Sequence, residues 1–269
     1  MPRPDTPPDL HVSRHHGILR LRLARPTARN AITPEMITAM LEELALAAPE
    51  HGVNVVALLA DGPDFCAGID LARASARTGP QDRRPRVTRH RHTDLGAHRL
   101  VQQLAQAVVP VAARIRGTAA GLGCALALIA DIGIVSTTAR FSVPYIRRGF
   151  TPDCGTTVLL PRLIGLARAR EMLFHGRAVT AEEAVRWGLI ARAYADPAVD
   201  AAFEEIVSRL AAAGDLGRTR AFVSDTVGQP LHNGLKRETL ALDLSLRTAD
   251  AREGVGAFLA KRKPEFEGR

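Results

Sequence analysis

The sequence predicts an α/β fold in which strands and helices alternate before a helical C-terminal region. Short apolar runs of strand length are separated by segments whose apolar residues recur with the period of an α-helix. From Ala198 onward most of the chain has the helical period, so the alternation ends there. With 269 residues, of which 46% are hydrophobic, the chain can bury a sizeable core without requiring two domains.

The first third of the chain is expected to hold a hairpin, a helix and a buried strand. Leucines alternate with arginines in the second strand of the hairpin, and Thr33 with Pro34 supplies an N-cap followed by proline at the first helical position. In chain order we expect a disordered tail over residues 1–8, hairpin strands over 10–14 and 18–23, an amphipathic helix from Pro34 to about residue 48, and a buried parallel strand over 53–60.

The middle of the chain is organised around residues 117–165. This segment is expected to form a glycine-punctuated turn, a helix of small residues, a strand and then an irregular loop that carries Asp153. Before it, the arginine-rich stretch over 72–93 has hardly any large apolar residue and is expected to be the least ordered part of the chain. A helix over 98–108 and a strand over 109–115 lie between the two.

The remaining elements are short until the helical region begins. Thr180 and Glu183 have the spacing of a capping box, which predicts the start of a helix. The expected elements are helices over 168–174 and 181–187, a strand over 189–194, and helices from residue 198 onward.

The composition indicates an anionic partner and a cytoplasmic protein. Lys and Arg number 36 against 28 Asp and Glu, a formal net charge of +8 that suits nucleic acid, a membrane surface or an anionic small molecule. The sequence signatures of common nucleic-acid modules are absent, so a phosphorylated small molecule competes well as the reason for this charge. The three cysteines form no CxxC pair, which argues against disulfides or a metal site and suits a reducing cytosol. The N-terminus lacks a signal-peptide core, and arginines and glycines interrupt the longest apolar region, so we expect no membrane partner.

Two glycine-containing loops each follow a predicted parallel strand. Gly121 and Gly123 open a helix, while Gly68 lies in the loop FCAGIDL. The spacing is not that of a dinucleotide fingerprint, because position 126 is Leu. One interpretation is that the glycines in both loops simply let a helix pack closely on a strand. Together, however, they can direct two backbone amides at one oxygen atom, which is the geometry of an oxyanion hole.

Several separated segments resemble the crotonase (enoyl-CoA hydratase/isomerase) superfamily. The matching segments, which span roughly residues 10–266, are RPTARNAIT, FCAGIDL, GTAAGLGCALALIAD, ARFSVPYIRRGFTPDCG, LLPRLIG, AVRWGLI and GVGAFLAKRKPEF. The resemblance implies a ββα spiral core over residues 9–196, a helical trimerisation region over 197–269, and a homotrimer or hexamer. It also implies an acyl-CoA substrate, with coenzyme A as part of the substrate rather than a permanently bound cofactor, and neither nucleic acid nor membrane as a partner.

The resemblance further assigns binding residues. The thioester carbonyl is expected between the backbone N–H groups of Ile69 and Leu122. The expected contacts to the CoA thioester are Arg29, Ala67, Gly68, Gly121, Gly123 and Lys261.

Asp153 is the expected proton-transfer group. Hydratases of the family carry two glutamates where this chain has Ala125 and Tyr145, whereas Asp153 matches the aspartate used by isomerase-type members. One carboxylate that removes a proton at one carbon and returns it at another moves a double bond, so isomerisation needs one acid/base group. The sequence therefore favours an enoyl-CoA isomerase.

Three functions besides isomerisation stay open at the level of the sequence. By resemblance to 4-chlorobenzoyl-CoA dehalogenases, Asp153 is a candidate nucleophile, His98 the base that activates water, and Tyr145 a donor to the aspartate. His98 can equally be a solvated or core histidine, and Asp153 a turn residue after Pro152. The second function is that of an enoyl-CoA hydratase, and the third is that of a CoA-binding protein without catalytic activity.

Overall fold

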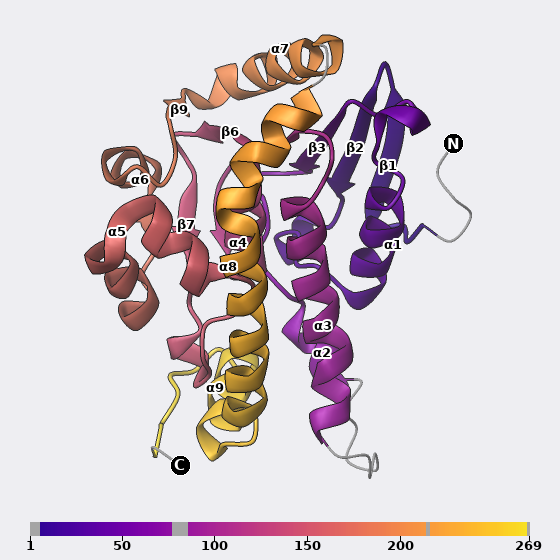
Figure 1. Cartoon of the computed structure of the whole chain (residues 1–269). Helices are drawn as coiled ribbons and strands as arrows, with labels where there is room; N and C mark the ends of the chain where they lie inside the picture. The colour runs from indigo at the N-terminus through magenta and orange to yellow at the C-terminus, as the bar shows by residue number, and fades with distance from the viewer. Residues whose placement is uncertain (1–5, 77–85, 214–215, 268–269) are drawn as a thin grey trace.

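The computed structural model describes residues 6–76, 86–213 and 216–267, and Figure 1 shows their arrangement. A six-stranded sheet has the order β1-β2-β3-β4-β6-β9, and a three-stranded sheet has the order β5-β7-β8. In the large sheet β1 is antiparallel to β2, and the other neighbours are parallel. The strands are β1 (Leu10–His15), β2 (Ile18–Leu23), β3 (Val55–Ala60), β4 (Val111–Ile115), β5 (Thr118–Ala120), β6 (Ile132–Ser136), β7 (Arg140–Ser142), β8 (Val179–Thr180) and β9 (Ala193–Tyr194).

Helices cover both faces of the large sheet, which explains the continuous apolar run of β3. Val55, Ala57 and Leu59 pack with α7 on one face, while their neighbours along the strand join the main core on the other. Figure 1 shows α7 lying across the top of the sheet, with α3 and α4 on the opposite side. The helices are α1 (Pro34–Leu44), α2 (Leu71–Ala76), α3 (Arg86–Ala105), α4 (Leu122–Ile129), α5 (Thr156–His175), α6 (Ala181–Trp187), α7 (Val199–Ala212), α8 (Leu216–Ser245) and α9 (Ala249–Leu259).

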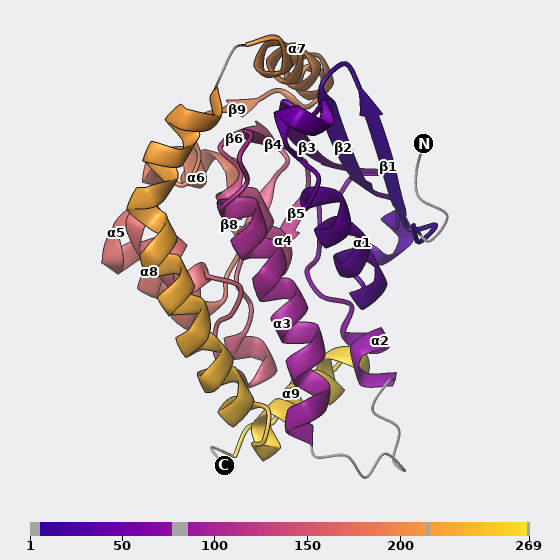
Figure 2. The same ribbon diagram turned by 45° about the vertical axis from the view of Figure 1, so that its right-hand side comes forward.

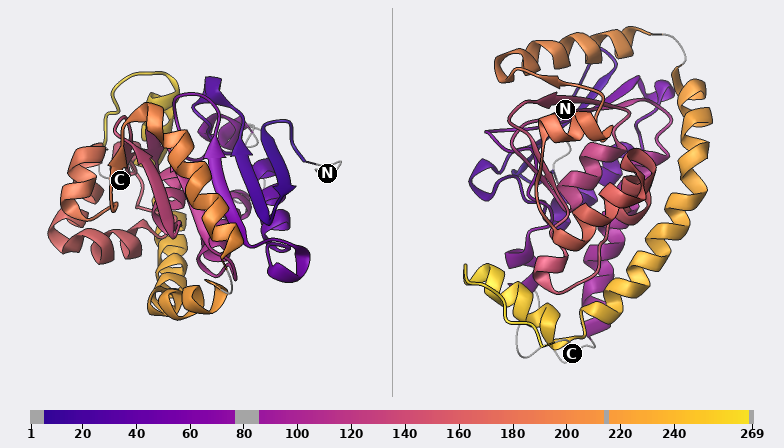
Figure 3. Two further views of the ribbon diagram at one scale, coloured as in Figure 1. Left: turned by 90° about the horizontal axis from the view of Figure 1, so that it is seen from above. Right: turned by 90° about the vertical axis from the view of Figure 1, so that its left-hand side faces the viewer.

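The C-terminal helices wrap the outside of this core. Figure 3 shows α8 as a long curved helix along one side of the molecule, and Figure 2 shows α3 and α8 facing each other across the region below α4. Helix α8 contacts both α3 and α5, so it closes over the segment that joins β7 to α5. None of the helices in the described ranges has the length and apolarity needed to cross a membrane.

The structure confirms the predicted fold class and several local signals. The hairpin, the buried strand β3 and the helical C-terminal region are present. The Thr33 side chain caps α1 by accepting from the Met36 amide, and Thr180 and Glu183 form the predicted capping box.

Several predicted boundaries are wrong, among them the end of the first helix, which is Leu44 and not about residue 48. The stretch over 72–93 is helical at both ends, because α2 includes residues up to Ala76 and α3 already begins at Arg86; its centre, residues 77–85, lies outside the described residues, as do residues 1–5 of the predicted tail. The expected helix over 98–108 is therefore longer at its start and ends at Ala105. The expected loop ends at Thr156, where α5 begins, although Pro161 lies inside α5 and Gly165 kinks it. The strand expected over 189–194 is reduced to β9, because it pairs with β6 through two residues only.

Candidate active site

The FCAGIDL loop lies directly against the glycine turn. The Cys66 amide donates to the Thr118 carbonyl at 2.8 Å, and the Ala120 amide donates to the Cys66 carbonyl at 2.9 Å. These bonds continue the edge of β5 into the loop, so they fix its position beside the start of α4.

Glycine is required at both points of closest approach. A Cβ on Gly123 would lie 2.2 Å from the carbonyl oxygen of Cys66. A Cβ on Gly68, where φ is +98°, would lie 2.9 Å from the carbonyl oxygen of Ala120 and 3.6 Å from the backbone nitrogen of Leu122. The two loops therefore meet through backbone atoms, with the Leu122 amide next to the loop that carries Ile69.

The amides of Ile69 and Leu122 are the two donors expected to hold the thioester oxygen. The Ile32 amide donates to Gly68 and the Asp70 amide donates to Ile32, so the N–H of Ile69, between them, points to the other side of its strand-like segment. Leu122 is the first residue of α4, after Gly121 with φ +54°, and its amide is one of those a helix leaves without an intrahelical acceptor. Among the described residues, no hydrogen-bond acceptor is found for either amide. The start of α4 also favours negative charge through its dipole.

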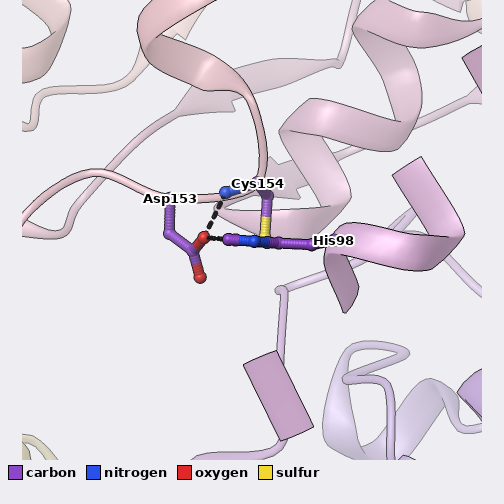
Figure 4. Close-up of side chains that lie close together, drawn as sticks. All are labelled: His98, Asp153 and Cys154. Atoms are coloured by element: carbon purple, nitrogen blue, oxygen red, sulfur yellow. Dashed lines mark hydrogen bonds and ion pairs between the residues drawn. The ribbon is translucent and has the colours of Figure 1, made fainter. Parts of the chain in front are cut away.

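Asp153 is buried in the segment between β7 and α5, and its two carboxylate oxygens differ. Oδ1 accepts from the Cys154 amide at 2.5 Å and is hydrogen-bonded to Nε2 of His98, as Figure 4 shows. No hydrogen bond to Oδ2 is found within residues 6–76, 86–213 and 216–267, and this oxygen points away from His98 in Figure 4. Two hydrogen bonds thus hold Oδ1 in place, while Oδ2 has no hydrogen-bond partner among the described residues.

His98 is a buried partner of Asp153, not a solvated histidine of a helix face. It is 5% exposed on α3 and lies between two hydrogen-bond partners. Its Nε2 contacts Asp153, and its Nδ1 lies 2.8 Å from Oγ1 of Thr239 on α8. The sequence placed His98 near Asp153 only by resemblance to the dehalogenases, whereas Thr239 was not among the expected site residues.

Tyr145 joins the aspartate to the glycine turn. Its hydroxyl donates to the backbone carbonyl of Asp153 at 3.2 Å, and a Cβ on Gly121 would lie 3.7 Å from the same hydroxyl. Burial raises the pKa of Tyr145 well above its ordinary value, and the nearby Cys154, Asp153 and Glu238 raise it further. Tyr145 is therefore a neutral hydrogen-bond donor.

Glu238 is a second buried carboxyl group that sequence reasoning missed. Its oxygens accept from the Gly155 amide at 2.6 Å, the Thr157 amide at 3.1 Å and the Thr157 hydroxyl at 2.5 Å. Glu238 thereby caps the start of α5. Because it lies 83 positions away from Gly155 in the sequence, no local sequence signal predicts this role. Burial raises the pKa of Glu238 above its ordinary value of 4.5, and the charge of Asp153 contributes in the same direction, while the hydrogen bonds oppose the shift.

The cysteines around the site are buried. Burial raises the thiol pKa of Cys66 and of Cys124 to about 12, so both stay protonated at neutral pH. Cys154 belongs with His98 and Asp153 to a group whose possible metal-ligand atoms lie within 4.8 Å of one another. Two of those atoms already share the His98–Asp153 hydrogen bond, so the arrangement is explained by protein contacts without a metal ion.

The expected CoA-binding residues lie in two places. Ala67, Gly68, Gly121 and Gly123 surround the two amides, and the exposed Arg29 adjoins them because its carbonyl accepts from the Ala67 amide at 2.9 Å. Lys261 is exposed just after α9, and no contact links it to the other candidate residues in the described part of the chain.

Comparisons with known proteins identify the family of the chain. The profile of the family described as enoyl-CoA hydratase/isomerase matches residues 13–269. The chain is 35% identical over 268 residues to 1,2-epoxyphenylacetyl-CoA isomerase of Escherichia coli, covering 96% of this chain and 97% of that protein. It is 32% identical over 267 residues to 2,3-dehydroadipyl-CoA hydratase of the same organism, covering 97% and 99%. The crystal structure of an enoyl-CoA hydratase from Mycobacterium avium subsp. paratuberculosis matches with a TM-score of 0.85 at 26% identity, covering 96% of this chain and 98% of the other.

Proposed function

The chain belongs to the enoyl-CoA hydratase/isomerase family, the crotonase superfamily, and from this premise we propose that it moves a double bond within an enoyl-CoA by proton transfer through Asp153. Members of the family act on CoA thioesters, so coenzyme A enters as part of the substrate. The two Escherichia coli relatives are named as an isomerase and as a hydratase, and the choice between the two reactions rests on the side chains of the site.

The observation that carries the proposal is the unequal use of the two Asp153 oxygens. The Cys154 amide and His98 fix Oδ1, while Oδ2 is left to take a proton from a substrate carbon. The same oxygen can return that proton at another carbon of the chain. Glu238 is not equivalent, because three hydrogen bonds occupy its carboxylate at the start of α5.

The amides of Ile69 and Leu122 are proposed to hold the thioester oxygen while the proton is removed. Negative charge develops on that oxygen as the α-carbon loses its proton, and preorganised amides stabilise this charge more than they stabilise the neutral carbonyl. One such donor contributes about 2.7–4 kcal/mol to transition-state stabilisation in known enzymes. Tyr145 supports this geometry, since its hydroxyl donates to the Asp153 carbonyl and lies where a side chain at Gly121 would contact it.

Water addition by two carboxylates has less support. Ala125 is fully buried on α4 and cannot exchange a proton, and the hydroxyl of Tyr145 donates to the backbone of Asp153. A hydratase would therefore have to add and activate water with Asp153 and His98 alone.

A nucleophilic role for Asp153 is the second candidate, and the buried His98 favours it. A carboxylate that attacks an acyl-CoA forms a covalent ester, and a neighbouring histidine can then activate the water that hydrolyses it. The hydrogen bond between His98 and Asp153 places such a base beside such a nucleophile.

The remaining assignments belong to the same proposal. Arg29, Ala67, Gly68, Gly121, Gly123 and Lys261 are proposed to contact the CoA portion of the substrate. A homotrimer or hexamer formed through the C-terminal region is proposed because α8 and α9 expose large apolar side chains at Leu240, Leu244, Phe258 and Leu259. Location in the cytoplasm stays a prediction.

The test compares 2-enoyl-, 3-enoyl- and dienoyl-CoA substrates with wild-type protein and with Asp153→Asn. We expect the wild type to shift the double bond and Asp153→Asn to lose at least about 100-fold in kcat, the range of general acid–base catalysis. Asp200→Asn is the matched control, since Asp200 is an exposed carboxylate on α7 that pairs with Arg114 and Arg116 on the other face of the sheet. Equal rates for wild type and Asp153→Asn contradict the proposal, and an acyl ester on Asp153 detected by mass spectrometry in a single turnover supports the second candidate instead.

A further inference from the structure

Two consecutive residues of α8, Glu238 and Thr239, make hydrogen bonds next to Asp153 and to His98, respectively. Glu238 binds the amides of Gly155 and Thr157, which directly follow the Asp153 segment. Thr239 lies 2.8 Å from Nδ1 of His98. Helix α8 therefore holds both the backbone that follows Asp153 and the histidine that pairs with Asp153. Among the described residues, no side chain of α8 makes a hydrogen bond to Asp153 itself.

The hydroxyl of Thr239 has a hydrogen-bond acceptor within its own helix. Its Oγ1 lies 2.9 Å from the carbonyl oxygen of Leu235, one turn earlier in α8. A carbonyl oxygen can only accept, so the single hydroxyl proton lies between these two oxygens. Oγ1 then faces His98 with a lone pair, and the contact to Nδ1 is a hydrogen bond that His98 donates.

A proton on Nδ1 constrains the other side of the imidazole ring. A neutral histidine with its proton on Nδ1 has a bare Nε2, which would face the bare Oδ1 of an ionised Asp153. The close contact between Nε2 and Oδ1 therefore needs one further proton, shared by these two atoms. Oδ1 also accepts from the Cys154 amide, which stabilises negative charge on the oxygen, so the proton belongs on Nε2.

We propose that Thr239 is a positioning residue that holds His98 as an imidazolium, so that His98 and Asp153 form an internal ion pair and Asp153 stays ionised with Oδ2 open. This rests on the proposed function only in taking Asp153 as the proton carrier. The other titratable groups that face the pair among the described side chains are Tyr145, Cys154 and Glu238. Without the hydroxyl, His98 is free to become the neutral tautomer with its proton on Nε2, and the pair then holds one proton fewer.

The experiment uses the full chain with 15N-labelled histidine and the variants Thr239→Val and Thr239→Ser. Valine keeps the size of threonine but has no hydroxyl, whereas serine keeps the hydroxyl. Thr38→Val is the matched control, because the Thr38 hydroxyl donates to the Pro34 carbonyl one turn earlier at 3.1 Å on α1 and has no hydrogen bond to a histidine among the described residues. The 15N chemical shifts distinguish imidazolium from either neutral tautomer.

We expect both His98 nitrogens to be protonated at neutral pH in the wild type, in Thr239→Ser and in Thr38→Val, and only Nε2 in Thr239→Val. We also expect kcat of Thr239→Val to fall about tenfold with KM little changed, since a displaced base loses orientation rather than binding. A wild-type His98 that is neutral, or nitrogen shifts that are the same in Thr239→Val, overturns the inference. The NMR result does not depend on turnover and tests the role of Thr239. The Asp153→Asn rates test the proposed function, so failure of one can be distinguished from failure of the other.

Discussion

Replacing Gly68 by alanine tests the contact on which the oxyanion hole depends. The backbone of Gly68 has φ +98°, a conformation that costs a residue with a side chain about 1–3 kcal/mol. The new methyl group would also lie 2.9 Å from the Ala120 carbonyl oxygen, so backbone atoms of the two loops have to separate. We expect Gly68→Ala to lower the free energy of unfolding by at least this strain.

The effect on catalysis should be larger than the effect on stability. The same methyl group would lie 3.6 Å from the nitrogen of Leu122, and it would occupy the approach to that amide. Loss of one oxyanion donor lowers kcat about 100- to 1,000-fold. Urea unfolding measures the first effect, and steady-state turnover of the best enoyl-CoA substrate measures the second.

Gly256→Ala is the matched control for Gly68→Ala. Gly256 lies in α9, and a Cβ there would have no atom within 4 Å. Alanine in a helix is favoured over glycine by about 1 kcal/mol, so this variant should be slightly more stable and fully active. A Gly68→Ala protein whose kcat lies within twofold of the wild type would refute the assignment of the Leu122 amide.

Three further predictions concern the buried groups around the site. Glu238→Ala leaves the Gly155 and Thr157 donors without their acceptor and should lower the free energy of unfolding by about 2–4 kcal/mol, measured in urea. Burial raises the folded-state pKa of Glu238 above 4.5, so its contribution to stability is fully present below pH 4.5 and declines as the pH rises through the folded-state pKa. Urea unfolding at several pH values should show this decline in the wild type and not in Glu238→Gln. The same dependence of the unfolding free energy on pH in both proteins would contradict the prediction. Cys66 and Cys124, with thiol pKa values of about 12, should resist iodoacetamide at pH 8 in the native protein and react in urea, and rapid native labelling by mass spectrometry would show that the loop and α4 open.

Local signals predicted those parts of the fold that local interactions determine. Thr180 and Glu183 form the capping box that their spacing indicated, and the apolar run of β3 is buried on both faces of the sheet. The start of α5 was missed because Pro161 and Gly165 resemble helix breakers, yet the proline is tolerated inside α5 and the glycine introduces a kink. The start of α3 was missed because an arginine- and histidine-rich stretch lacks the apolar period on which the prediction depended.

In the candidate site, too, the sequence predicted the residues that lie in short motifs and missed those that depend on packing between distant helices. Asp153 and the two glycine loops stand in short motifs, and they were identified from the sequence. Glu238 and Thr239 belong to a charged and polar stretch of α8 that resembles a solvated helix face, and the packing of α8 on α3 and α5 buries Glu238 and partly buries Thr239. The structure adds two neighbours to Asp153, since His98 pairs with it and Glu238 lies nearby.

The most direct test of the central claim is turnover of a 3-enoyl-CoA in D₂O by the wild type and by Asp153→Asn. Proton transfer through one carboxylate predicts a 2-enoyl-CoA product in the wild type, at least about 100-fold slower formation in Asp153→Asn, and no covalent adduct; the product carries solvent deuterium only in the fraction of turnovers in which the Asp153 proton exchanges before it is returned. Product formation by Asp153→Asn at the wild-type rate, or an acyl ester on Asp153, would contradict the claim that Asp153 acts as the proton carrier of an enoyl-CoA isomerase.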